Sequence, residues 1–107
     1  MAKVKIDWDR IANSIAHDAT VRGEYSVGDA HCVLGGLAVD YGVELPKGIR
    51  NGRRIERLVD FPAALAAATG LDRYQLVQMQ DLNDAFFVVE LRREVLLAWV
   101  RIQRSGV

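Results

Sequence analysis

The chain has 107 residues, of which 50% are hydrophobic and 26% charged, a composition that excludes a disordered polypeptide. Fourteen basic and fourteen acidic residues give a formal net charge of zero, so the overall positive charge of many nucleic-acid-binding proteins is absent. A single cysteine excludes an intramolecular disulfide. At this length we expect one domain over residues 1–107.

Our expectations for localisation and cofactors rest on three patterns that are absent from the sequence. It contains no apolar stretch of membrane-spanning length and no N-terminal apolar segment typical of a secretion signal, so we expect a cytoplasmic protein without a membrane partner. His17, Asp29, His31 and Cys32 offer metal-ligand atoms, but no pair of them has a recognised ligand spacing. We therefore expect no metal and no cofactor.

Two helices are predicted in the first third of the chain. The first spans residues 7–21, where apolar side chains recur at helical spacing and Asp7 can cap the free N–H groups of the first turn. The second spans about 30–41, with Asp29 as its N-cap and Gly42 at its end. The residues between the two helices are typical of turns.

Residues 43–60 interrupt the helical pattern with several turn formers. We predict an irregular loop here, in which Asn51-Gly52 could close a short hairpin. The part over 45–57 holds five basic residues and one acidic residue, a local net charge of +4. These basic residues are Lys47, Arg50, Arg53, Arg54 and Arg57. They could contact an acidic partner or nucleic-acid phosphates, although a solvated loop is the favoured explanation.

Three more helices follow the basic loop. Pro62 begins a third helix that stops at Gly70, and Asp72 caps a fourth that runs to about Leu82. A last helix spans about 87–104. Its apolar residues on one face are Val88, Leu91, Val95, Ala98, Trp99 and Ile102. The sequence therefore predicts a small all-α domain of about five helices.

Cys32 allows a catalytic and a structural interpretation. Near a helix N-terminus, free N–H groups favour a thiolate, as in papain-like cysteine enzymes. Such an enzyme needs a histidine base, and because His31 diverges from its neighbour by about 100° of helical rotation, only His17 could reach the thiol. The alternative is a small residue buried between helices. Gly35 and Gly36 favour it, because mid-helix glycines cost about 1 kcal/mol each and indicate close helix packing.

Residues 66–79 resemble a helix-turn-helix, with a small residue in the first helix, a glycine turn and apolar anchors in the second. In that interpretation 72–80 would be the recognition helix and the basic loop would contact phosphates. The side chains able to reach bases would be Arg73, Tyr74, Gln75 and Gln78. Asp72 and Asp81 argue against it, because they place negative charge on or beside the recognition helix. An ordinary corner between two helices needs the same glycine and anchors.

Two short motifs, "HCVLGGLA" and "LNDAFF", lie some fifty residues apart. Together they resemble small helical proteins of actinobacteria and their phages, which pair a C-x-x-G-x-[Leu/Ala] helix with an Asn-Asp turn and whose function is uncharacterised. The matching residues are Cys32, Gly35, Gly36, Leu37, Leu82, Asn83 and Asp84. The resemblance implies a helical fold and no reaction. It permits the hypothesis that Asn83-Asp84 lies beside Cys32 and satisfies the end of the second helix, although a capping pair between the last two helices explains these residues as well.

Three classes of function remain open. We expect a non-enzymatic protein-interaction module, whose partner is an unknown protein or a second copy of the chain bound through the helix over 87–104. The alternative is a DNA-binding protein that uses the 72–80 helix and the basic loop. The third is an enzyme centred on Cys32 with His17 as its base.

Overall fold

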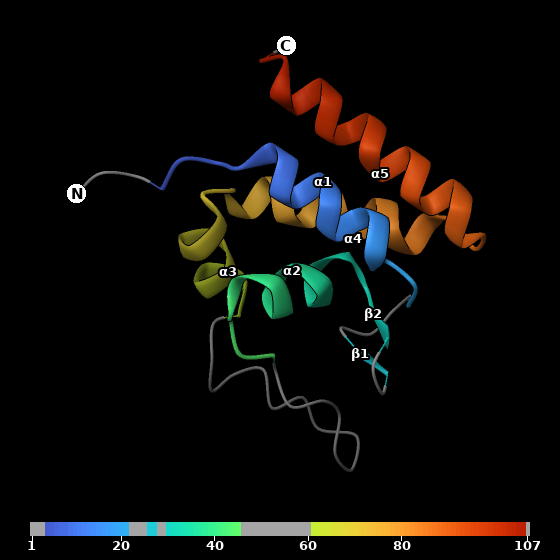
Figure 1. The fold of residues 1–107 in the computed structure, drawn as a ribbon, viewed down its shortest axis with the longest axis horizontal. Coiled ribbons are helices and arrows are strands. Elements are labelled where there is room, and N and C mark those ends of the chain that lie inside the picture. The colour runs from blue at the N-terminus through green and yellow to red at the C-terminus, as the bar shows by residue number, and fades with distance from the viewer. Residues whose placement is uncertain (1–3, 22–25, 28–29, 46–60, 107) are drawn as a thin grey trace.

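The fold, in a computed structural model that describes residues 4–21, 26–27, 30–45 and 61–106, is all-α (Figure 1). The described part contains five helices and one two-stranded antiparallel ribbon. The elements are α1 (Trp8–His17), β1 (Ser26–Val27), β2 (Ala30–His31), α2 (Val33–Tyr41), α3 (Phe61–Thr69), α4 (Arg73–Ala85) and α5 (Val89–Arg104). The all-α class and the number of helices agree with the sequence prediction.

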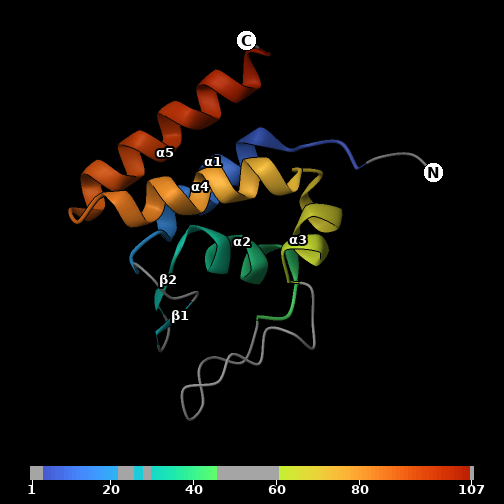
Figure 2. The ribbon, with the colours of Figure 1, turned by 180° about the vertical axis from the view of Figure 1, so that it is seen from behind.

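Helix α2 forms the centre of the packing. It contacts α1, α3 and α4, and all of its residues from Val33 to Ala38 are buried. Helix α5 packs on α1 and α4 and runs along one edge of the molecule in both views (Figures 1 and 2). The buried apolar residues come from all five helices, so the core is continuous across the bundle.

Helix α1 starts at the predicted cap and ends four residues before the predicted end. The Asp7 carboxylate accepts a hydrogen bond from the Arg10 N–H at 3.0 Å, which confirms the cap. The helix stops at His17, and Ala19 has a left-handed backbone with φ of 62°. The chain turns here because the next two residues, 20 and 21, donate their N–H groups to the His31 carbonyl.

The predicted start of α2 is wrong. Asp29, the expected N-cap, lies outside the described residues, and residues 30 and 31 are extended as β2. The N-cap is Cys32, whose Sγ accepts from the Gly35 N–H at 3.3 Å. Hydrogen bonds from the 20–21 segment to the carbonyl of residue 31 hold this stretch in an extended conformation, and the sequence pattern does not reveal such tertiary pairing.

Helix α4 starts as predicted and continues past the predicted break. Asp72 is the N-cap, and it forms a capping box with Gln75 in which each side chain accepts from the other residue's N–H. The predicted break at Asn83-Asp84 is wrong, because the helix continues to Ala85. Asn83 forms tertiary hydrogen bonds and Asp84 accepts from two side chains of α4, while the N-cap of α5 is Val88.

The corner between α3 and α4 has the predicted packing. Gly70 has a φ of 83°, and a Cβ there would collide with the Val4 carbonyl oxygen, so only glycine fits. The expected anchors Leu71, Leu76 and Met79 are buried. Between α2 and α3, residues 43–45 have no regular structure, while the predicted hairpin and the basic side chains from Lys47 to Arg57 lie outside the described residues.

The face of helix α5 that is buried differs from the apolar face that the sequence pattern indicates. Of the six apolar residues that share a face in the sequence, only Trp99 is buried. The side that packs on α1 and α4 contains Arg92, Leu96 and Val100 besides this tryptophan. The Trp99 ring meets Trp8 of α1 edge to face, with centroids 6.1 Å apart. The remaining apolar residues therefore stay on the outside of the bundle.

Candidate functional site

A polar cluster lies where α4 meets the start of α2. We call Cys32, Gln80, Asn83 and Asp84 the Cys32 cluster. Residues 80, 83 and 84 share one face of α4 because they are three and four positions apart. The Cys32 thiol donates to Gln80 Oε1 at 3.6 Å, and Gln80 Nε2 donates to Asp84 Oδ2 at 3.0 Å. These hydrogen bonds link the first residue of the cluster to the last.

Asn83 joins three segments of the chain and is fully buried. Its Oδ1 accepts from the Val33 N–H at 3.0 Å, one of the N-terminal N–H groups of α2 that lack an intrahelical partner. Its Nδ2 donates to the Val21 carbonyl at 2.8 Å and to Asp84 Oδ1 at 3.0 Å. The side-chain amide thus holds α4, the start of α2 and the segment after α1 together. The Asn-Asp hypothesis expected the contact with α2 but not the one with Val21.

The Cys32 thiol is protonated at neutral pH. Its pKa is raised from 9.0 to about 11, chiefly by burial, and the nearby Asp84 carboxylate acts in the same direction. Hydrogen bonds from the backbone around Gly35 act in the opposite direction, but burial dominates. The site therefore lacks the thiolate that a cysteine nucleophile requires.

We expect Cys32 to react with Ellman's reagent, a probe of free thiolates, only slowly in the folded protein. A rise in pKa from 9.0 to about 11 lowers the thiolate fraction at pH 8 by about a hundredfold, and burial slows the reaction further. The measurement is the reaction time course from pH 7 upward, with the guanidinium-unfolded chain as the reference. Complete reaction of the folded protein within the reagent's mixing time at pH 8 would contradict the structural role.

Neither histidine serves Cys32 as a base. His17 is exposed, and its Nδ1 lies 2.8 Å from the Asn13 carbonyl of its own helix. His31 Nδ1 lies 3.3 Å from Asp18 Oδ1. Among the described residues, no hydrogen bond joins either ring to the thiol. The sequence-level candidate pair of Cys32 and His17 is therefore not assembled.

Gly36 occupies a position where α2 passes the end of α1. A Cβ on Gly36 would lie 2.5 Å from the Asp18 Cβ, a separation that real side chains do not reach. This close approach is the reason that the sequence analysis gave for a mid-helix glycine pair, and both Gly35 and Gly36 are buried. The glycines are thus part of the packing between helices.

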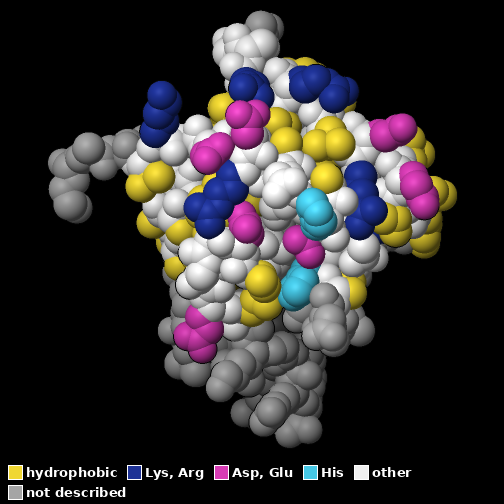
Figure 3. Space-filling model, in the orientation of Figure 1, with side chains coloured by type: hydrophobic (Ala, Val, Ile, Leu, Met, Phe, Trp, Pro, Cys, Tyr) yellow, Lys and Arg dark blue, Asp and Glu magenta, His cyan; other side chains and the backbone are white. Residues whose placement is uncertain are grey.

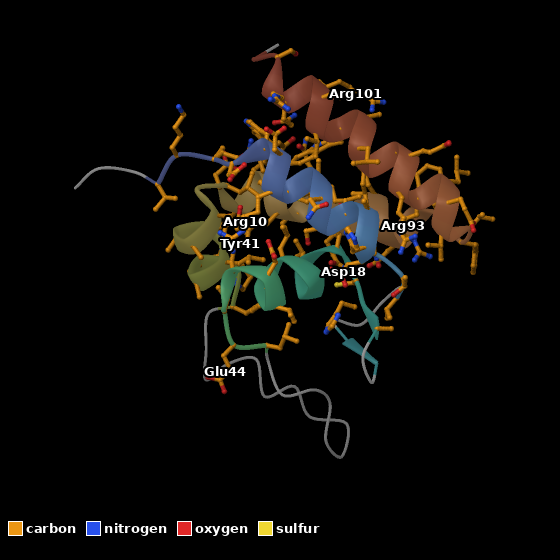
Figure 4. The ribbon with its side chains drawn as sticks, in the orientation of Figure 1. Arg10, Asp18, Tyr41, Glu44, Arg93 and Arg101 are labelled. Atoms are coloured by element: carbon orange, nitrogen blue, oxygen red, sulfur yellow. The ribbon has the colours of Figure 1, made fainter. Side chains whose placement is uncertain are left out.

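Two arginines of α5 hold the end of α1, and neither was predicted from the sequence. The Arg92 guanidinium is 2% exposed and donates to the carbonyls of Ala19 at 2.6 Å, Phe86 at 2.9 Å and Phe87 at 3.2 Å. Arg93 donates to the Asp18 carbonyl at 2.9 Å (Figure 4). Cations are favoured there because the last carbonyls of a helix lack intrahelical partners. Only one feature of the sequence could have indicated that Arg92 is buried: it lies four residues, about one helical turn, before the apolar Leu96.

Two of the four residues expected to read DNA bases, Gln75 and Gln78, form hydrogen bonds within the protein. Gln75 accepts from the Asp72 N–H and donates to Gln103 Oε1 at 3.1 Å. Gln78 Oε1 accepts from the Trp99 indole N–H at 3.1 Å. Both glutamines thus connect α4 to α5, and reading a base would require breaking these hydrogen bonds.

The exposed side of α4 carries a mixture of residue types. Arg73, Tyr74, Val77 and Asp81 are all exposed, with Tyr74 at 71%. One cation, one aromatic ring, one aliphatic side chain and one carboxylate do not form a positive surface. The basic residues that would bind phosphates, including Arg50, Arg53, Arg54 and Arg57, lie outside the described residues.

The described residues offer neither a metal site nor a membrane-spanning helix. No group of three or more histidine, cysteine or acidic side chains there could hold a metal ion. Within the same residues, no helix combines the length and the apolar character needed to cross a membrane. Comparisons of the chain with known protein families, curated proteins and solved structures found no match.

The outer face of α5 carries apolar side chains at helical spacing. We call Val88, Leu91, Val95, Ala98 and Ile102 the α5 stripe. Three of these residues are exposed, Val88 and Ile102 at 56% and Leu91 at 45%, while the other two are half-buried. Figure 3 shows hydrophobic side chains exposed among charged ones over α5.

Proposed function

We propose that this chain is a non-enzymatic protein-interaction module whose contact surface is the α5 stripe. The observation that carries the proposal is the exposure of Val88, Leu91 and Ile102 along one helix face. Apolar side chains aligned at the surface of a small domain lower the free energy of a complex when a partner covers them.

The Cys32 cluster supports this proposal because its hydrogen bonds are used within the protein. The thiol keeps its proton, and the amides of Gln80 and Asn83 both donate to the Asp84 carboxylate. A catalytic site needs groups that can turn toward a substrate, whereas these groups fix the helices relative to one another. The cluster thus gives α5 a stable bundle from which to present its outer face.

DNA binding is the weaker candidate. Gln75 and Gln78 are hydrogen-bonded to α5, and the exposed side of α4 includes the acidic Asp81. No contact or charge pattern within the described residues favours a nucleic acid over a protein as the partner. We therefore retain DNA binding only as the outcome that would replace the interaction proposal.

Photo-crosslinking tests the proposal with two matched positions. Ile102 in the α5 stripe and Val77 on α4 are both 56% exposed, so a benzophenone amino acid replacing either one is equally accessible. In cells that express the full chain, we expect discrete protein adducts from position 102 and few from position 77. Equal adducts from both positions, or none from position 102, would contradict the assignment of the contact surface.

A further inference from the structure

The α5 stripe has the spacing of a helix that pairs with another helix. Its residues follow one another at intervals of three, four, three and four, which is the heptad pattern of a two-helix seam. From Val88 to Ile102 the stripe is about 21 Å long, at about 1.5 Å per residue. A straight helix of a partner could therefore contact all five residues.

The stripe lies between the buried side of α5 and a charged side. At about 100° per residue, its centre is roughly a quarter-turn from the buried Leu96 and Trp99. On the other side of the stripe lie two exposed residues of opposite charge, Glu94 and Arg101. In both views α5 runs along the edge of the molecule with α1 and α4 on one side of it (Figures 1 and 2), and three residues of the stripe are exposed.

Glu94 and Arg101 are seven residues apart and lie along the same line of the helix. Neither side chain forms a hydrogen bond or ion pair with another of the residues that the structure describes. Figure 4 shows Arg101 on the side of α5 turned away from α1. The two charges are thus positioned to meet groups on a partner.

We infer that a second copy of this chain covers the α5 stripe, with the two α5 helices antiparallel. This inference rests on the proposed function and names its partner. With Val95 opposite Ala98 of the second copy, Leu91 faces Ile102 of that copy, and every apolar residue from 91 to 102 on the stripe meets another. The dimer has two-fold rotational symmetry, so each of these contacts occurs twice.

The charges select the antiparallel orientation. In that arrangement Glu94 lies beside Arg101 of the second copy. The two residues are offset along the helix axis by about two positions, or roughly 3 Å, and the reciprocal pair forms as well. A parallel pair would instead place the Glu94–Arg101 lines of the two copies on opposite sides of the seam, where these charges cannot pair with each other. Opposite charges flanking an apolar seam fix partner choice and orientation in paired helices.

The dimer is expected to be weak. Its seam is a single short helix face, so the interface falls at the small end of specific protein contacts, and we expect a Kd on the order of micromolar or above. Charge reversals at Glu94 and Arg101 change exposed residues, so the variants keep the fold and affect association alone.

Sedimentation equilibrium over a wide concentration range tests the inference with a charge swap. We expect Glu94→Arg and Arg101→Glu each to raise the dimer Kd by about tenfold, because like charges then face each other twice per dimer. The double variant E94R/R101E should regain the wild-type Kd. Asp81→Arg on α4 makes the same change of net charge as Glu94→Arg but lies outside the stripe, so it should leave the Kd unchanged.

Each outcome separates the inference from the proposed function. A wild-type chain that stays monomeric at all concentrations would overturn the dimer, while adducts of other proteins at position 102 would leave the interaction module standing. A dimer that ignores the single reversals, or that the double variant fails to restore, would overturn the antiparallel seam. A monomer without adducts would overturn both.

Discussion

Replacing Asn83 with alanine should lower the free energy of unfolding by about 3–4 kcal/mol. The side chain is fully buried, and its loss leaves the Val33 N–H and the Val21 carbonyl without their partner. A buried polar group without a hydrogen bond costs about 1–3 kcal/mol; the Val33 N–H becomes such a group, and the half-buried Val21 carbonyl loses its partner as well. The loss also falls at the start of α2, which packs on three other helices.

Urea unfolding followed by circular dichroism measures this effect. Asn13→Ala is the matched control, because Asn13 is an exposed asparagine inside α1 and its change should stay within about 0.5 kcal/mol of wild type. A loss below about 1 kcal/mol for Asn83→Ala would show that the amide does not hold the segments together.

Arg92→Met is expected to destabilise the fold by about 3–5 kcal/mol. Methionine can follow the path of the arginine stem, but it donates no hydrogen bond to the carbonyls of Ala19, Phe86 and Phe87. The Ala19 carbonyl is the critical one, because this residue has a left-handed backbone that its surroundings must stabilise. Lysine should not rescue the loss, since one ammonium cannot reproduce the planar fork of the guanidinium.

Arg104→Met provides the comparison in the same helix. Arg104 pairs with Asp9 at 2.7 Å on the surface, so its replacement should cost at most about 1 kcal/mol. Thermal unfolding of both variants measures the difference. Equal stability of the two would mean that the hydrogen bonds of Arg92 add nothing beyond those of a surface ion pair.

The sequence predicted those features of the fold that depend on local chemistry. Asp7 and Asp72 cap their helices as expected, because the carboxylates reach N–H groups only three residues away. Gly70 and the anchors Leu76 and Met79 form the expected corner, since turn conformation and apolar spacing are both local signals. The burial of Cys32 also matches the packing interpretation, which rested on its glycine neighbours.

Features set by distant contacts could not be predicted in the same way. The start of α2 shifted because the carbonyl of His31 pairs with the chain after α1, a contact that no local pattern encodes. In α5 the apolar face predicted the helix but not its orientation, because buried Arg92 replaces an apolar side chain on the packed side. Only the paired motifs indicated that Asn83 meets the start of α2, because those residues are fifty positions apart.

Backbone NMR spectra recorded at low and high protein concentration test the central claim, that the chain acts through the outer face of α5. The account predicts concentration-dependent shifts at residues 88–102, including Glu94 and Arg101, and unchanged signals around Cys32 and Asn83. Spectra that do not change along α5, combined with shifts at residues 73–78 when duplex DNA is added at low salt, would contradict it. That result would assign the function to α4 in place of α5.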